Sequence, residues 1–165
     1  MAGYQKHISF SFFCFLCLLP PSYFFIQPSP ILTVELLIIT LIGGLFPDID
    51  IKSKGQYYFY FFLFFITIPM IYIQYDKQIL YILWISLVPI IVKHRGIFHH
   101  PLFLTTGTIC TWSFVYSCNN ELAKQIKPHC FFFCIGTYSH LILDYGLKNF
   151  LKKLHGKKIS TTYTR

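Results

Sequence analysis

Long apolar runs separated by short polar stretches dominate the chain and predict an all-α membrane protein. The runs cover residues 8–26, 31–46, 57–75, 79–92, 102–118 and 130–147. A helix that crosses a bilayer needs about 20 mostly apolar residues, and the run at 79–92 is barely long enough. We therefore expect a polytopic transmembrane helical bundle of about five to six short spans.

Proline and polar residues mark the ends of these runs. Pro20-Pro21 interrupts the first run, Pro28-Ser29-Pro30 separates it from the second, and residues 119–128 are predicted to be a polar loop. A basic start at Lys6 before an apolar run is also typical of a signal peptide. Because no small-x-small cleavage pattern follows, the sequence favours a retained first span.

The end of the chain differs in composition from the rest. Residues 148–165 are basic and polar, which predicts a cytoplasmic tail that lies on the surface or is partly disordered. The sequence is therefore divided into one membrane-embedded domain, residues 1–147, and this tail.

Composition supports a membrane protein and changes the meaning of the net charge. The chain is 55% hydrophobic and only 12% charged, with a mean hydropathy of +0.55, whereas soluble domains are about 25% charged. A net charge of +8 would suggest nucleic acid as the partner of a soluble protein. In a membrane protein, basic residues collect on the cytoplasmic side, so membrane lipids are the expected partners and no nucleic acid is expected.

Six spans would place most Lys and Arg residues on one side of the membrane. Of the 14 basic residues, those assigned to the other side are Lys77, Lys124 and Lys127. This bias predicts that both termini are cytoplasmic. The same topology brings the N-terminus, the 48–55 loop and the 93–100 loop to the cytoplasmic ends of the helices.

A dense group of polar residues, Lys93 to Pro101, interrupts the apolar pattern. His94 and His99 are five residues apart, which on a continuous helix would place them roughly 140° apart. Gly96 breaks the helix between them and Pro101 suits the first turn of a new helix. A loop here could turn both imidazoles toward one point, although a charged loop at the membrane surface would give the same pattern.

Acidic and imidazole side chains recur at three other places on the cytoplasmic face, the first of which is His7 before the first apolar run. Asp48 and Asp50 are two apart, so an extended backbone would direct both carboxylates to one side. His140 and Asp144 are spaced i, i+4 and share a helix face. Such groups inside a membrane segment cost several kcal/mol unless they are paired, hydrated or metal-bound. A solvated turn at 48–50 and a hydrogen-bonded pair on the last helix are the alternatives.

Mixed His and Asp ligation suits Zn²⁺, with Mn²⁺ or Fe²⁺ as alternatives. The six cysteines lie among phenylalanines and are expected to be buried hydrophobic side chains without disulfides. The candidate metal ligands are the imidazole and carboxylate groups that the predicted topology brings to one face, namely His7, Asp48, Asp50, His94, His99, His140 and Asp144.

These blocks resemble the YdjM-like family of bacterial inner-membrane proteins, which are described as metal-dependent hydrolases. The resemblance covers about residues 7–146 and rests on His7, Gly44-Leu45-Phe46-Pro47-Asp48-Ile49-Asp50, the 94–99 block and Ser139-His140 with Asp144. It implies that the seven candidate ligands form the metal site of a multi-pass inner-membrane protein. Two positions depart from the family pattern: Phe98 replaces Thr or Ser, and His100 replaces Ser.

The expected function is hydrolysis of an ester or phosphoester, including lipid-linked ones, by a metal-activated water. Asp48 or Asp50 is the candidate proton acceptor, and Arg95 is the candidate binder of an anionic group of the substrate. Arg95 could instead bind lipid headgroups. A divalent-metal transporter and an inactive, metal-stabilised scaffold or partner-binding protein use the same residues and stay open as alternatives.

Overall fold

The part of the chain that the structure describes is helical and contains no strand. The computed structural model describes residues 3–50, 54–72 and 97–154. Its elements are α1 (Tyr4–Ser22), α2 (Pro30–Leu45), η1 (Phe46–Asp50), α3 (Lys54–Tyr72), η2 (Ile97–His99), α5 (Pro101–Cys118), α6 (Asn120–Tyr145) and α7 (Leu147–Leu154), where η marks a 3₁₀-helix. The predicted all-α class is confirmed.

Local signals explain where several helices begin and end. The Ser29 side chain accepts a hydrogen bond from the backbone N–H of Leu32 and so caps α2, with Pro30 in its first turn. Pro101 begins α5, as predicted. Gly146 ends α6 with a φ of 72°, a conformation that glycine adopts without steric cost.

The predicted polar loop at 119–128 is wrong, because these residues form the first third of α6. The Asn119 side chain accepts a hydrogen bond from the backbone N–H of Leu122 and caps the helix. Glu121 lies in the first turn and pairs with Lys124 at 2.8 Å, an arrangement that favours a polar helix. The polar residues of this segment therefore indicate an exposed helix and not a loop.

The other predicted runs agree with helices to within a few residues. The first helix begins at Tyr4 and ends at Ser22, so Pro20 and Pro21 lie in its last turn and do not break it. The 102–118 run corresponds to α5. The predicted span at 79–92 lies outside the described residues.

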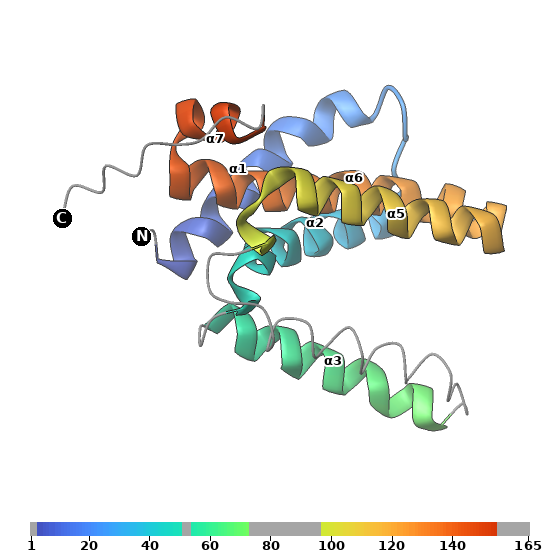
Figure 1. Ribbon diagram of the computed structural model, residues 1–165. Coiled ribbons are helices and arrows are strands. Elements are labelled where there is room, and N and C mark those ends of the chain that lie inside the picture. Colours follow the sequence, from blue (N-terminus) through green and yellow to red (C-terminus); the bar gives the residue numbers. More distant parts are fainter. Residues whose placement is uncertain (1–2, 51–53, 73–96, 155–165) are drawn as a thin grey trace.

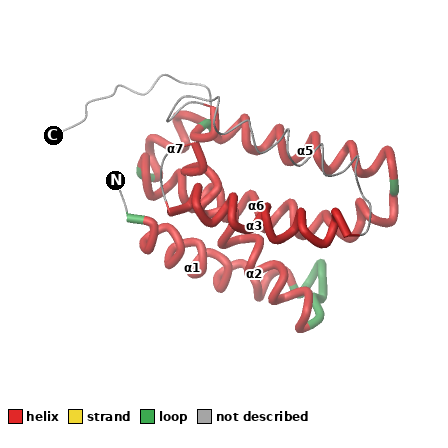
Figure 2. Tube along the Cα trace, turned by 90° about the horizontal axis from the view of Figure 1, so that it is seen from below, coloured by secondary structure: helices red, strands yellow, loops and turns green. Residues whose placement is uncertain are grey.

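Helix α6 is the central element of the fold. It contacts α1, α2, α5 and α7, whereas α3 joins the rest of the described chain through η1. Figure 1 shows α5 and α6 lying side by side, with α3 separate from the bundle, and Figure 2 shows α1 and α2 on the other side of α6. Phe15, Leu36 and Phe132, from three different helices, form one buried cluster. The residues on α6 are therefore held from several sides.

Glycines let α2 and α6 approach each other closely. A Cβ at Gly136 would lie 2.1 Å from the backbone oxygen of Thr40, and one at Gly43 would lie 2.4 Å from that of Phe133. Small residues at helix crossings are the usual device for close packing inside membranes. A Cβ at Gly44 would meet the Ser11 hydroxyl at 2.0 Å, so α1 reaches the same crossing.

A buried hydrogen bond between Ser11 and Ser139, at 2.7 Å, joins α1 to α6 beside this crossing. Ser139 donates to the Gly136 carbonyl, so Ser11 is the donor to Ser139. Ser11→Ala should lower the free energy of unfolding by about 1 kcal/mol, or about 2–4 °C in the unfolding midpoint for a chain of this size. Thermal unfolding in detergent, beside the exposed control Ser117→Ala, measures this. An equal midpoint in both variants would contradict the assigned role.

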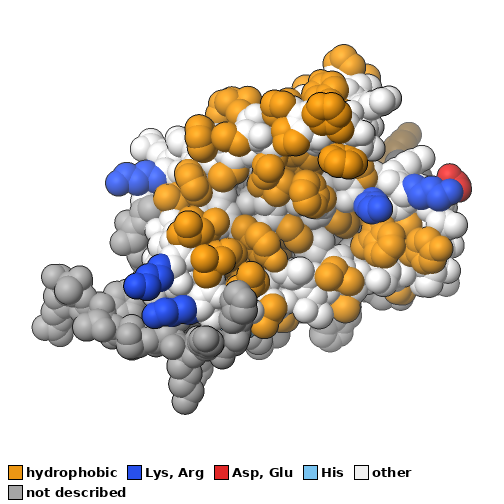
Figure 3. Space-filling model, turned by 90° about the horizontal axis from the view of Figure 1, so that it is seen from above, with side chains coloured by type: hydrophobic (Ala, Val, Ile, Leu, Met, Phe, Trp, Pro, Cys, Tyr) orange, Lys and Arg blue, Asp and Glu red, His pale blue; other side chains and the backbone are white. Residues whose placement is uncertain are grey.

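One helical segment among the described residues, Pro30–Asp48, is long and apolar enough to cross a membrane, with a mean hydropathy of 2.0. The five to six predicted spans are thus not confirmed. Thr and Ser residues dilute the apolar character of α5, and the first third of α6 is polar. Large hydrophobic side chains are nevertheless exposed on each α-helix that the structure describes. Figure 3 shows them covering the middle of one face, with Lys and Arg toward its two ends.

Candidate metal centre

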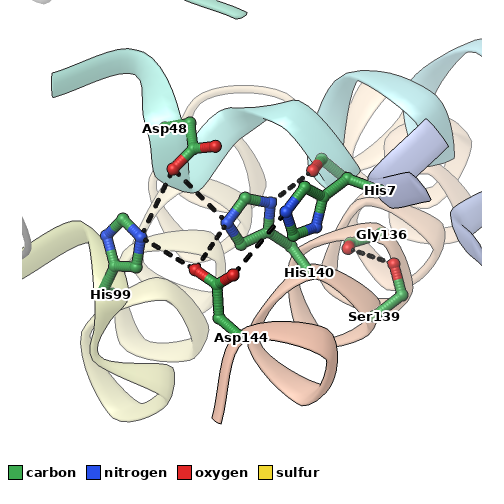
Figure 4. Close-up of polar contacts among 8 residues, drawn as sticks. His7, Asp48, His99, Gly136, Ser139, His140 and Asp144 are labelled. Carbon is green, nitrogen blue, oxygen red and sulfur yellow. Dashed lines mark hydrogen bonds and ion pairs between the residues drawn. The ribbon is translucent and has the colours of Figure 1, made fainter. Parts of the chain in front are cut away.

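Four side chains from three elements meet at the end of the α2–α6 crossing (Figure 4). His140 and Asp144 come from the last turns of α6, Asp48 from η1, and His99 from η2. One ligand atom from each lies within 4.8 Å of all the others. Both histidines are buried, with exposures of 0% and 1% for His140 and His99. The predicted shared face of His140 and Asp144 is confirmed.

The distances between these atoms are those expected around a metal ion. Nε2 of His99 and Nε2 of His140 each lie 3.5 Å from Oδ1 of Asp48. The same two nitrogens lie 3.7 and 3.5 Å from Oδ2 of Asp144. These separations exceed hydrogen-bond length. Four ligands at about 2.1 Å from Zn²⁺ in tetrahedral geometry stand about 3.4 Å apart, so these four imidazole–carboxylate separations are close to those around such an ion.

A backbone carbonyl orients His140. Its Nδ1 lies 2.8 Å from the carbonyl oxygen of Gly44, and it must donate there because a carbonyl only accepts. Gly44 lies in the last turn of α2, where carbonyl oxygens generally lack intrahelical partners and can accept from other groups. In the neutral imidazole, a proton on Nδ1 would leave the Nε2 lone pair directed at the carboxylates. Nε2 is buried and accepts no hydrogen bond from the described residues, which is the state a metal ligand requires.

His7 lies against the cluster from α1. Its ring stacks on that of His140 at 3.8 Å between centroids, with an angle of 15° between the planes. Its Nε2 lies 3.7 Å from Oδ1 of Asp144, the carboxylate oxygen that does not face His99. The structure thus brings His7 to the site, where it lies against two of the four grouped residues, His140 and Asp144, on the side opposite Asp48 (Figure 4).

The two carboxylates set the electrostatics of His99. Burial lowers the pKa of His99, but its interactions with Asp144 and Asp48 outweigh burial and raise that pKa above its usual value. The carboxylates thus favour a cation at this point, whether a proton on His99 or a metal ion. A metal ion would have to displace that proton.

The structure brings together five of the seven predicted ligands. The side chain of Asp50, and all of His94 and Arg95, lie outside the described residues. One premise is wrong: residues 46–50 form a 3₁₀-helix, not an extended strand. With three residues per turn, positions two apart are about 120° apart, so this spacing does not place Asp48 and Asp50 on one side.

Two features were missed from the sequence, one at the site and one away from it. The Gly44 carbonyl is a backbone group, so no side chain in the sequence points to its role. The pair Gly43-Gly44 is the only local sign that another helix packs closely there. A second acid–imidazole pair, Glu35 with His129 at 3.1 Å, joins α2 to α6 nearer their other ends. Both of its members are more exposed than the cluster histidines.

Comparison with known proteins identifies one family. A family model described as YdjM inner membrane protein matches residues 1–149. No curated protein and no solved structure matches the chain.

Proposed function

The chain belongs to the YdjM inner membrane protein family, and from this premise we propose that it is a membrane-bound, metal-dependent hydrolase of phosphoesters or esters. The observation that carries the proposal is the buried His₂Asp₂ group of Asp48, His99, His140 and Asp144. Histidine and carboxylate are ligands that catalytic zinc sites use, and such sites keep one position for water. Water would therefore replace one of the two carboxylates on the ion or occupy a fifth position. Zinc is the proposed ion, with manganese or iron as alternatives.

The residues of the chain have distinct proposed roles. When bound, a divalent ion at this site would activate a water molecule and polarise the bond that is attacked. His99, His140, Asp48 and Asp144 would hold the ion, and His7 would fix the Asp144 carboxylate. Asp50 is proposed as the proton acceptor, with Asp48 as the alternative, and Arg95 as the binder of an anionic group of the substrate.

The membrane arrangement is also part of the proposal. We take α1, α2, α3, α5 and the apolar part of α6 as spans, with the run at 79–92 as a sixth. Both termini would then be cytoplasmic, together with the metal centre. The exposed apolar side chains on these helices support this arrangement, and a site at the membrane surface favours a lipid or lipid-linked substrate.

Hydrolysis by purified protein tests this function. Protein in detergent, stripped with chelator and reloaded with Zn²⁺, Mn²⁺ or Fe²⁺, is assayed on a panel of aryl phosphomonoesters, phosphodiesters, carboxylic esters and phospholipids. We expect turnover on the phosphoester members that needs metal and falls at least about a hundredfold in Asp48→Asn, since this change removes a charged ligand. Glu35→Gln is the matched control, because it neutralises a carboxylate outside the cluster.

Other outcomes would support the rival functions. Metal binding without turnover on any member of the panel would contradict the hydrolase and favour a metal-stabilised scaffold. Metal uptake into liposomes that contain the protein, without hydrolysis, would favour a transporter. A protein that binds no metal would overturn all three.

A further inference from the structure

An apolar groove lies beside the candidate metal centre. It has a volume of about 410 Å³ and is walled by α5 and the middle of α6, with contributions from α2, η1 and η2. On α5 its lining extends from Phe103 to Thr111, which corresponds to about 12 Å of helix. The volume is in the range of sites for small ligands.

One end of the groove adjoins the cluster. Phe46 and Phe98 line this end; Phe46 shares η1 with Asp48, and Phe98 directly precedes His99. The two rings contact each other edge-to-face at 5.7 Å. Phe98 also contacts Phe103 on α5, and Phe46 contacts Phe133 on α6. Aromatic rings therefore line the end of the groove that lies nearest the polar cluster.

The remaining walls offer little to a polar ligand. The hydroxyl groups of Thr108 and Thr111 donate to carbonyls of their own helix. At the far end His129 bonds to Glu35 and to the Gln125 carbonyl. The groove runs along the helices, and in a bilayer hydrocarbon chains lie in that same direction. A polar cluster near one end of an apolar groove matches a lipid, which joins a polar head to an apolar chain.

Resting on the proposed function, we infer that the substrate is a phospholipid, with its phosphoester at the metal centre and one acyl chain in the groove between α5 and α6. This inference explains why Phe98 replaces the Thr or Ser of the family pattern. An apolar ring between the cluster and the groove would direct the acyl chain away from the polar cluster. Lipid in a membrane is the amphiphile that an inner-membrane protein meets at the highest concentration.

A substitution at Gly107 can test whether the groove holds an acyl chain. It lines the groove, and a Cβ there would meet no atom within 4 Å. A large side chain at this position would therefore enter the groove without a backbone clash, and replacing glycine inside a helix raises helix propensity. Gly107→Trp should fill the groove while the protein folds and keeps its metal.

The experiment is photo-crosslinking in lipid nanodiscs with a phospholipid that carries a diazirine on one acyl chain. Crosslinks are mapped by mass spectrometry in wild type, in Gly107→Trp and in Ile109→Trp, a matched control on an exposed position of α5. In wild type, crosslinks to the groove-lining positions of α5 should exceed several-fold those to Ile109 and Phe114 on the exposed face. Gly107→Trp should abolish this excess, and Ile109→Trp should retain it.

The outcomes separate this inference from the proposed function. Crosslinks spread evenly around α5, or an excess that survives Gly107→Trp, would overturn the acyl-chain site even if the protein hydrolyses phosphoesters. A groove-specific excess that Gly107→Trp removes supports the site, and in chelator-stripped protein it should persist because the chain binds through apolar contacts. If that excess is present but neither phosphoesters nor carboxylic esters are hydrolysed, the groove binds lipid and the proposed hydrolase function fails.

Discussion

His140→Ala should remove most of the metal from the purified protein. The change deletes one of four grouped ligand atoms and leaves two carboxylates and one imidazole. If the four ligands share a binding free energy of about 12 kcal/mol, one of them accounts for about 3 kcal/mol, or about a hundredfold in affinity. Elemental analysis of detergent-purified protein, expressed as metal per chain, measures the loss.

His129→Ala is the matched control for this result. It removes an imidazole from the same helix, and that imidazole pairs with Glu35 outside the cluster. We expect near-stoichiometric metal in the control and wild type. Asp48→Ala, on a different element, should lose metal as His140→Ala does. If His140→Ala kept as much metal as wild type, the group would not be a metal site.

Gly136→Ala should destabilise the protein by several kcal/mol. Its new methyl group would lie 2.1 Å from the Thr40 carbonyl oxygen and 2.8 Å from the Gly44 nitrogen. Both atoms belong to the backbone of α2, so the helices would have to move apart. His140 lies one turn further along α6, and its bond to the Gly44 carbonyl would lengthen with that movement. We therefore expect a lower unfolding midpoint together with reduced metal content.

Gly107→Ala makes the same chemical change where a Cβ meets no atom within 4 Å. Alanine in a helix interior is favoured over glycine by about 0.5–1 kcal/mol, so the two variants should shift the midpoint of thermal unfolding in opposite directions. Circular dichroism in detergent measures both midpoints. A Gly136→Ala protein as stable as Gly107→Ala would contradict the close helix crossing.

The helices could be predicted from the sequence because hydrophobic runs and capping residues act locally. The 102–118 run and the start at Pro101 needed no information from distant residues. The polar start of α6 was wrongly predicted to be a loop, because the prediction used hydropathy and ignored the capping residues. Asn119 as an N-cap and Glu121 in the first turn indicate a helix start, although few apolar residues follow them.

The sequence by itself determined the all-α class, the kinds of ligand available and the pairing of His140 with Asp144, because i, i+4 spacing on a helix acts within one turn. Only the tertiary structure decided that Asp48 and His99 meet that pair at one point. That meeting depends on how closely α2 and α6 cross, which glycine at position 136 permits. It also depends on the Gly44 carbonyl, which orients His140 across a separation of 96 residues. Local periodicity carries no information about contacts between such distant residues.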